Sequence, residues 1–261
     1  MKLEYVPLLK VQRDLYDLPR GFERFREYIR TMTDPGSGEL KVPLVAMNPM
    51  GKDHLPPFLD HLLVIDADGV GTRALAEAES ALAGEPGEYR ACLVVSDDLK
   101  GGWTNRYASE YSYRFEQRAY YRRAWLAANL WTSEQYDAGT VREELLQCVY
   151  RVAYVQRHGP AHTLGDMLAQ ERYAMRGAGS TTPTLDEDDL AYTSEVLGEY
   201  MSATDRATII AALFGDPAAR DLGYRPLGLS PRAGLALAAA DLPYDLEDAR
   251  NRSARMPGRK K

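Results

Sequence analysis

Three polar loops hold most of the side chains in this sequence that could perform chemistry. Each loop follows directly on a short apolar segment of the kind that forms a buried strand. They comprise residues 48–54, 97–106 and 132–134. Ligands of open α/β sheets bind beyond the carboxyl ends of parallel strands. If the three strands are parallel, the loops meet at one edge, where carboxylates, cations and amide donors would form an enzyme-like crevice.

The second loop, DDLKGGWTNR, is the richest of the three. Asp97 or Asp98 could act as a base or metal ligand, while Lys100 and Arg106 could hold an anionic group. The two glycines allow the backbone to approach a ligand closely, and Trp103 could stack on a planar group. The alternative is a tight turn with a packed tryptophan and solvated charges. The density of polar groups directly after a buried strand favours the functional interpretation.

These loops supply the predicted site residues. The acid–base candidates are Asp97, Asp98 and Glu134. The predicted substrate-binding residues are Asn48, Lys52, Lys100, Trp103, Asn105 and Arg106. The sequence identifies no cofactor.

Histidine spacing gives no support for a metal site. The sequence has no HExxH or CxxC motif, and His54 and His61 are too loosely placed to define a metal site. His158 and His162 lie four residues apart, but the Gly-Pro pair between them breaks the helix that would align them. We therefore expect no zinc site and assign no metal ligand among the histidines.

Motifs of three common enzyme classes are also missing. No GxSxG elbow and no GxGxxG after a strand is present, which argues against an α/β-hydrolase and a dinucleotide-binding protein. The Gly-Lys pair in the loop 48–54 lacks the preceding spaced glycine of a phosphate-binding P-loop. Any activity must therefore be argued from single residues.

Composition indicates a globular cytoplasmic protein. The 261 residues are 45% hydrophobic and 27% charged, which is ordinary globular composition and provides a buried core. No run approaches the roughly 20 apolar residues of a membrane helix, and the charged N-terminus does not resemble a signal peptide. Cys92 and Cys148 lie in apolar stretches, which predicts buried free thiols in a reducing compartment.

The charge is unevenly distributed along the chain. The formal net charge is −6, yet the segment 250–261 holds six Lys and Arg and no acid, which leaves −12 for the rest. An acidic body argues against a broad nucleic-acid surface, since phosphate binding needs clustered positive charge. We expect the basic tail, 246–261, to be disordered, although it could touch polyanions.

Hydrophobic periodicity predicts an α/β fold. Apolar runs predict strands at 42–47, 89–96 and 124–131, with 1–6 or 107–115 as a possible further strand. Residues 104–117 also fit a helix. Helices are predicted at 7–18, 20–32, 56–65, 72–83, 140–156, 164–176, 185–202, 204–214 and 230–240. In the second of these helices, one apolar face is expected to dock on the core; it consists of Phe22, Phe25, Ile29 and Met32.

Strands alternating with helices favour a small, largely parallel sheet flanked by helices, with a C-terminal helical extension. The predicted domains are an α/β core at 1–176, a helical subdomain at 185–245 and the basic tail.

Three stretches, VPLVAMNPMGKDH, DDLKGGWTNRY and YVQRHGPAHTLGDMLAQE, resemble those of an uncharacterised bacterial protein family. The resemblance covers roughly residues 1–175 and implies no activity, cofactor or site residue.

Two functional hypotheses remain from the sequence. The first is an enzyme that acts on a small anionic substrate at the carboxyl ends of the strands. The second is a non-catalytic binding or assembly protein that uses its amphipathic helices and basic tail. We expect a small-molecule ligand, no membrane partner and no nucleic-acid partner, and self-association stays open.

Overall fold

The computed structural model describes residues 1–99, 105–180 and 182–240. The predicted tail therefore lies outside the described residues. The chain forms two compact units, one from Met1 to Val149 and one from Tyr150 onward, so their boundary falls within helix α7 (Ala138–His158). The predicted domain limits remain a prediction. Within the described residues, no helix combines the length and apolar character needed to cross a membrane.

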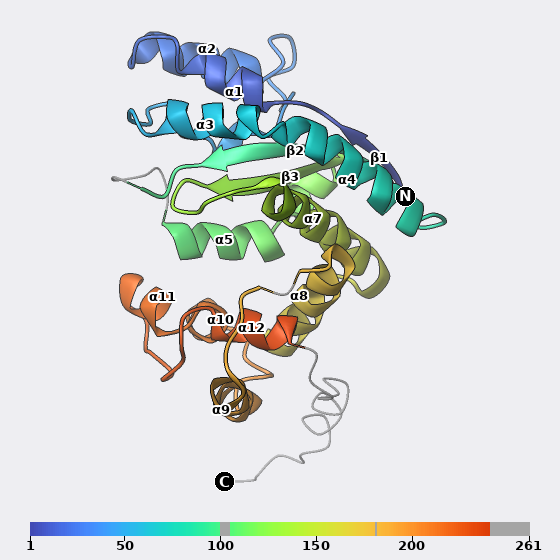
Figure 1. Cartoon of the computed structure of the whole chain (residues 1–261), viewed down its shortest axis with the longest axis vertical. Helices are drawn as coiled ribbons and strands as arrows, with labels where there is room; N and C mark the ends of the chain where they lie inside the picture. Colours follow the sequence, from blue (N-terminus) through green and yellow to red (C-terminus); the bar gives the residue numbers. More distant parts are fainter. Residues whose placement is uncertain (100–104, 181, 241–261) are drawn as a thin grey trace. The chain divides into compact units, whose positions relative to one another are not determined.

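The first unit contains the predicted parallel sheet (Figure 1). Its strands, β1 (Lys2–Tyr5), β2 (Glu88–Ser96) and β3 (Trp125–Trp131), lie in the order β1-β2-β3 with both pairings parallel. The predicted strands at 89–96 and 124–131 are confirmed. Of the two candidates for a further strand, the N-terminus forms β1, while 107–115 lies in helix α5 (Arg106–Phe115).

The strand predicted at 42–47 is wrong. The structure has a short 3-10 helix there, η1 (Leu44–Ala46), and Leu44 is fully buried with its carbonyl accepting a 3.0 Å hydrogen bond from the Tyr28 hydroxyl. Pro43 lacks the backbone N–H that a strand in this position would donate. Leu44 is therefore buried without belonging to a strand of the sheet.

Helices cover both faces of the sheet (Figure 1). One face carries α1 (Leu9–Leu15), α3 (Leu55–Val64) and α4 (Ala67–Ala81). The other face carries α5 and the first part of α7, while the short helix α6 (Arg118–Tyr121) precedes β3. This two-sided cover explains why β2 from Ala91 onward and all of β3 are buried at every position rather than at alternate ones.

Helix α2 (Phe22–Met32) does not dock through its predicted apolar face. Its buried residues are Arg24 and Tyr28, whereas Phe22 is 74% exposed. The Arg24 guanidinium lies over the Tyr16 ring, 5.2 Å from its centroid, and donates to the backbone carbonyls of Leu18 and Tyr16. These contacts offset the free-energy cost of burying a charged side chain. The docking face is therefore chosen by hydrogen bonding and stacking rather than by apolar content alone.

The second unit is helical in its described residues. After α7 its helices are α8 (Leu164–Ala178), α9 (Glu187–Gly198), α10 (Arg206–Phe214), α11 (Asp216–Asp221) and α12 (Ala233–Ala239). Thr163 forms the predicted N-cap of α8, in a capping box with Asp166. Between α7 and α8, Arg151 donates to Glu171 at 2.9 Å, and both side chains are buried. Helix α11 was not predicted.

Candidate functional site

The carboxyl ends of β2 and β3 bring two of the predicted loops together. Ser96 is the register partner of Trp131, so both strands end at the same level of the sheet. Thr132 N also donates to the Ser96 carbonyl at 3.1 Å, which extends the pairing by one residue. Asp97 and Asp98 therefore emerge directly beside the loop that starts at Thr132.

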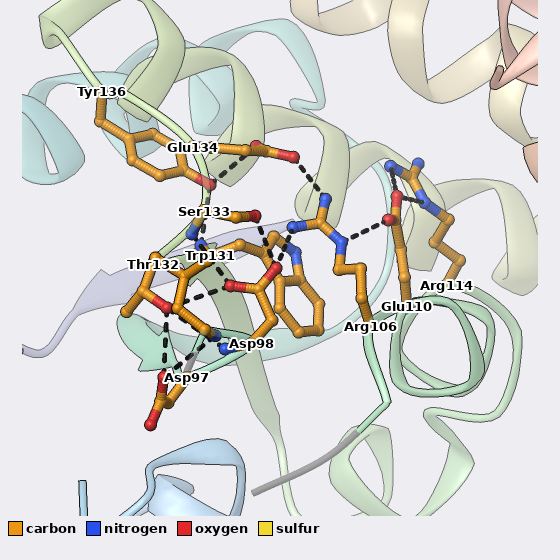
Figure 2. Close-up of polar contacts among 11 residues, drawn as sticks. Asp97, Asp98, Arg106, Glu110, Arg114, Trp131, Thr132, Ser133, Glu134 and Tyr136 are labelled. Carbon is orange, nitrogen blue, oxygen red and sulfur yellow. Dashed lines mark hydrogen bonds and ion pairs between the residues drawn. The ribbon is translucent and has the colours of Figure 1, made fainter. Parts of the chain in front are cut away.

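Asp98 is held by the loop that follows β3 (Figure 2). Its Oδ1 accepts hydrogen bonds from Ser133 N at 2.9 Å and Thr132 Oγ1 at 3.0 Å. Its Oδ2 accepts from Ser133 Oγ at 2.6 Å and from Arg106 Nη1 at 3.2 Å. With only 3% of its side chain exposed, Asp98 is a buried carboxylate whose position is fixed from several directions.

Arg106 is the centre of this network (Figure 2). Besides Asp98, its guanidinium bonds Glu110 through Nε at 3.0 Å and Glu134 through Nη2. The guanidinium also lies 4.2 Å from the centroid of the Trp131 ring. Burial lowers the pKa of Arg106, but the carboxylates of Glu110 and Glu134 outweigh it, and the net pKa lies above its ordinary value. Arg106 is therefore a permanent cation surrounded by acids.

Glu110 and Arg114 extend the network along α5. Arg114 donates to Glu110 Oε1 from Nε at 2.8 Å and from Nη2 at 2.6 Å. Neither residue is among those predicted from the sequence. The signal was the four-residue spacing from Arg106 through Glu110 to Arg114, which aligns alternating charges on one helix face.

Asp97 forms a second polar centre beside the first. It is 3% exposed, and it accepts hydrogen bonds from Asn48 Nδ2 at 2.8 Å, Leu99 N at 3.2 Å and Thr132 Oγ1 at 3.3 Å. His54 Nε2 lies 2.8 Å from Asp97 Oδ1. Thr132 Oγ1 lies within hydrogen-bond distance of both Asp97 and Asp98, and its single proton can be donated to either carboxylate, so Thr132 connects the two centres.

His54 belongs to this polar network, although the sequence suggested only a metal-ligand role for it. A carboxylate can only accept, so the His54 Nε2 facing Asp97 carries a proton. Its other ring nitrogen, Nδ1, is buried and has no hydrogen-bond partner among the described residues. An unsatisfied buried nitrogen on a carboxylate-oriented histidine is an arrangement that catalytic sites use.

The loop 48–54 reaches Asp97 although no strand precedes it. Tyr16 donates its hydroxyl proton to the Asn48 carbonyl at 2.6 Å, and Asn48 Oδ1 accepts from Met50 N at 3.0 Å. Burial raises the pKa of Tyr16, with a further contribution from Asp97, so the hydroxyl remains a donor. His54 then lies at the N-cap position of α3, which fixes its backbone.

Glu134 is the most exposed acid of the site. Its side chain is 39% exposed, and its Oε2 accepts from the Tyr136 hydroxyl at 3.0 Å. The same hydroxyl oxygen accepts from Trp131 N at 2.9 Å. Burial raises the pKa of Tyr136, and Glu144 and Glu134 raise it further, so the phenol stays protonated.

The other predicted residues are Lys52, Asn105, Lys100 and Trp103. Lys52 is exposed within the loop 48–54. Asn105 is the N-cap of α5, where its Oδ1 accepts from Ala108 N at 3.0 Å, which is a structural role. Lys100 and Trp103 lie outside the described residues. The structure thus joins Asn48, Asp97, Asp98, Arg106 and Glu134 in one network.

The network has a distinctive charge pattern. Its carboxylates are Asp97, Asp98, Glu110 and Glu134, and its cations are Arg106 and Arg114, so it carries a formal charge of −2 with His54 neutral. Across the described part of the chain, no group of three or more His, Cys, Asp or Glu is arranged to hold a metal ion.

Comparison with known proteins finds a relative that is similar to this chain over part of its length. No family model matches the chain, and no solved structure matches it. The uncharacterised protein YjfC of Bacillus subtilis strain 168 is 30% identical over 96 residues. That stretch covers 33% of this chain and 32% of the Bacillus protein, so the chain spans about a third of that relative's length. The match is consistent with the resemblance to an uncharacterised bacterial family.

Proposed function

We propose that this chain is an enzyme that acts on a small anionic substrate at the carboxyl ends of β2 and β3, with His54 and Asp97 as its acid–base pair. The observation that carries the proposal is the buried Asp97 carboxylate, which holds His54 Nε2 at 2.8 Å and leaves Nδ1 without a partner among the described residues. The carboxylate orients the ring and stabilises its protonated form. Nδ1 is then the nitrogen that exchanges a proton with the substrate.

The surroundings of Asp97 support this role over simple charge neutralisation. Asn48 and Thr132 already supply hydrogen bonds to both carboxylate oxygens. Asn48 and His54 come from one loop and Thr132 follows β3, so two segments distant in sequence converge on Asp97, which itself follows β2. Fixing one carboxylate–histidine pair from several elements is how catalytic groups are preorganised.

The charge of the substrate follows from the cations near this pair. Lys52 lies two residues before His54 and is exposed, and Arg106 lies in the network that Thr132 joins to Asp97. A guanidinium stacked on an indole presents a planar set of donors suited to a carboxylate or phosphate. In this proposal Asp98 positions Arg106, and Glu134 is the exposed acid of the site.

The test is a thermal-shift screen of small organic anions, followed by mass spectrometry of each hit after incubation with the protein. Wild type should convert a hit, while His54→Gln should still bind it but convert it about 10²–10⁴-fold more slowly. Asp97→Asn should lose conversion as well, because the ring is no longer oriented.

His162→Gln is the matched control, since His162 is exposed and belongs to the second unit. It should convert the hit at the wild-type rate. Equal conversion by wild type and His54→Gln would refute the proposal, provided that both proteins unfold at the same temperature without ligand.

The alternative, a non-catalytic assembly protein, has one observation in its favour. Phe22 on α2 is 74% exposed, and Val45 in η1 is 50% exposed. Exposed apolar side chains of this size are common at contact surfaces. If this alternative holds, light scattering after size exclusion should show an oligomer for wild type and a monomer for Phe22→Ser.

A further inference from the structure

Arg106 contacts three carboxylates that differ in how firmly they are held. Only 3% of the Asp98 side chain and 1% of the Glu110 side chain are exposed, compared with 39% for Glu134. Asp98 also accepts from Thr132 and Ser133, and Glu110 from Arg114. Apart from Arg106, the hydrogen bond that holds Glu134 comes from the Tyr136 hydroxyl. Glu134 is therefore the carboxylate that can leave Arg106 with the loss of the fewest other hydrogen bonds.

The guanidinium stays in place when Glu134 leaves. The Trp131 ring lies 4.2 Å from Arg106 Cζ, and Asp98 and Glu110 bond Nη1 and Nε. Departure of Glu134 would expose Nη2 while the plane of the guanidinium remains fixed from three sides. Such a preorganised donor loses little freedom when it binds a new acceptor.

The charge balance restricts what can replace Glu134. Asp98, Glu110 and Glu134 face Arg106 and Arg114, which is one negative charge in excess. A monoanionic carboxylate that takes the place of Glu134 leaves this balance unchanged. A fourth anion bound without displacement, or a dianionic phosphate in place of Glu134, would add repulsion in a poorly solvated site.

We infer that Glu134 occupies the anion-binding position of Arg106 in the free protein, and that a substrate carboxylate displaces it. This inference rests on the proposed function and names its substrate class: a small molecule with a carboxylate. Tyr136 gives the displaced Glu134 a hydrogen-bond partner that does not depend on Arg106. Glu134 is thus an internal competitor of the substrate.

Propionate binding to wild type and Glu134→Gln, measured by calorimetry, tests the inference, because propionate carries one carboxylate and one negative charge at neutral pH. Glutamine keeps the shape of the side chain but removes its charge, so it competes poorly for Arg106. If Glu134 occupies Arg106 about nine-tenths of the time, its removal should tighten propionate binding about tenfold. Glu195→Gln, an exposed acid on α9, should bind propionate as wild type does.

Equal propionate affinity of wild type and Glu134→Gln, or binding to neither, would overturn the inference. A larger gain for inorganic phosphate at pH 8, where it is mostly dianionic, than for propionate would overturn the substrate class. Failure of the proposed function has a different signature, namely undiminished conversion by His54→Gln. His54 contacts Asp97, whereas Arg106 bonds Asp98, Glu110 and Glu134, so His54→Gln should bind propionate as wild type does.

Discussion

The side chain of Gln12 takes the place of a strand beside Leu93. Gln12 Nε2 donates to the Leu93 carbonyl at 2.9 Å, and Gln12 Oε1 accepts from Val95 N at 2.8 Å. The pairing of β1 with β2 ends at Tyr5 and Ala91, which leaves this edge of β2 without a neighbouring strand. A fully buried amide therefore satisfies the backbone of β2 just before the candidate site.

Replacing Gln12 by leucine should destabilise the first unit. The change leaves one buried N–H and one buried C=O without partners, at about 1–3 kcal/mol each. Urea unfolding should therefore show a loss of about 2–6 kcal/mol in the free energy of unfolding. Gln135→Leu, at an exposed position, should stay within about 0.5 kcal/mol of wild type, and a similarly small loss for Gln12→Leu would contradict the structure.

Replacing Arg106 by leucine should destabilise the protein. Asp98 would lose its guanidinium partner and Glu110 one of its two, and both carboxylates are buried, which costs about 3–5 kcal/mol at neutral pH. Urea unfolding at pH 7 measures this loss in the free energy of unfolding. A loss below about 1 kcal/mol would argue against the network.

Replacing Tyr136 by phenylalanine tests the hydroxyl that joins Trp131 to Glu134. The Trp131 N–H would lose its 2.9 Å acceptor in a buried position, and Glu134 would lose a donor. We expect a loss of about 1–3 kcal/mol in unfolding free energy, and a shift of the Trp131 amide resonance in NMR spectra. Tyr192→Phe, on a tyrosine that is 48% exposed, should change stability by less than about 0.5 kcal/mol.

Asp205 should make stability fall in acid. Its carboxylate accepts from Thr208 N at 2.9 Å at the start of α10, and this backbone hydrogen bond lowers its pKa. A group with a lowered folded-state pKa stabilises above its unfolded pKa, and that contribution is lost as pH falls through the folded value. Asparagine keeps the cap without a titrating charge, so the stability of wild type relative to Asp205→Asn should decrease from pH 6 to pH 2.5.

The other acids are the same in both proteins. The difference between their unfolding free energies, measured in urea across this pH range, therefore reports on Asp205. NMR titration should place its midpoint below that of an ordinary aspartate. A difference that does not vary with pH would show that the carboxylate does not cap α10.

Local chemistry made several elements predictable from the sequence. The apolar runs at 89–96 and 124–131 form β2 and β3, because both are short, rich in apolar residues and followed by polar loops. Thr163 caps α8 as predicted, since the capping interaction involves residues only three apart. The meeting of the loops after β2 and β3 followed from the expectation that the strands are parallel.

Other features were settled by partners distant along the chain. The run 42–47 has the composition of a strand. Leu44 in this run is buried, and its carbonyl accepts from the Tyr28 hydroxyl, so it needs no neighbouring strand. Helix α2 docks through Arg24 and Tyr28, because carbonyls and rings elsewhere in the fold satisfy those side chains. A sequence pattern records apolar spacing but not the position of these partners.

The sequence by itself determined the parallel α/β class, the positions of β2 and β3, and the loop that carries Asp97, Asp98 and Arg106. Only the tertiary structure decided that His54 faces Asp97, and that Arg106 is surrounded by Asp98, Glu110 and Glu134. Strands and caps depend on neighbours within a few residues, whereas the charge balance of a buried site depends on every group that the fold brings within a few ångströms.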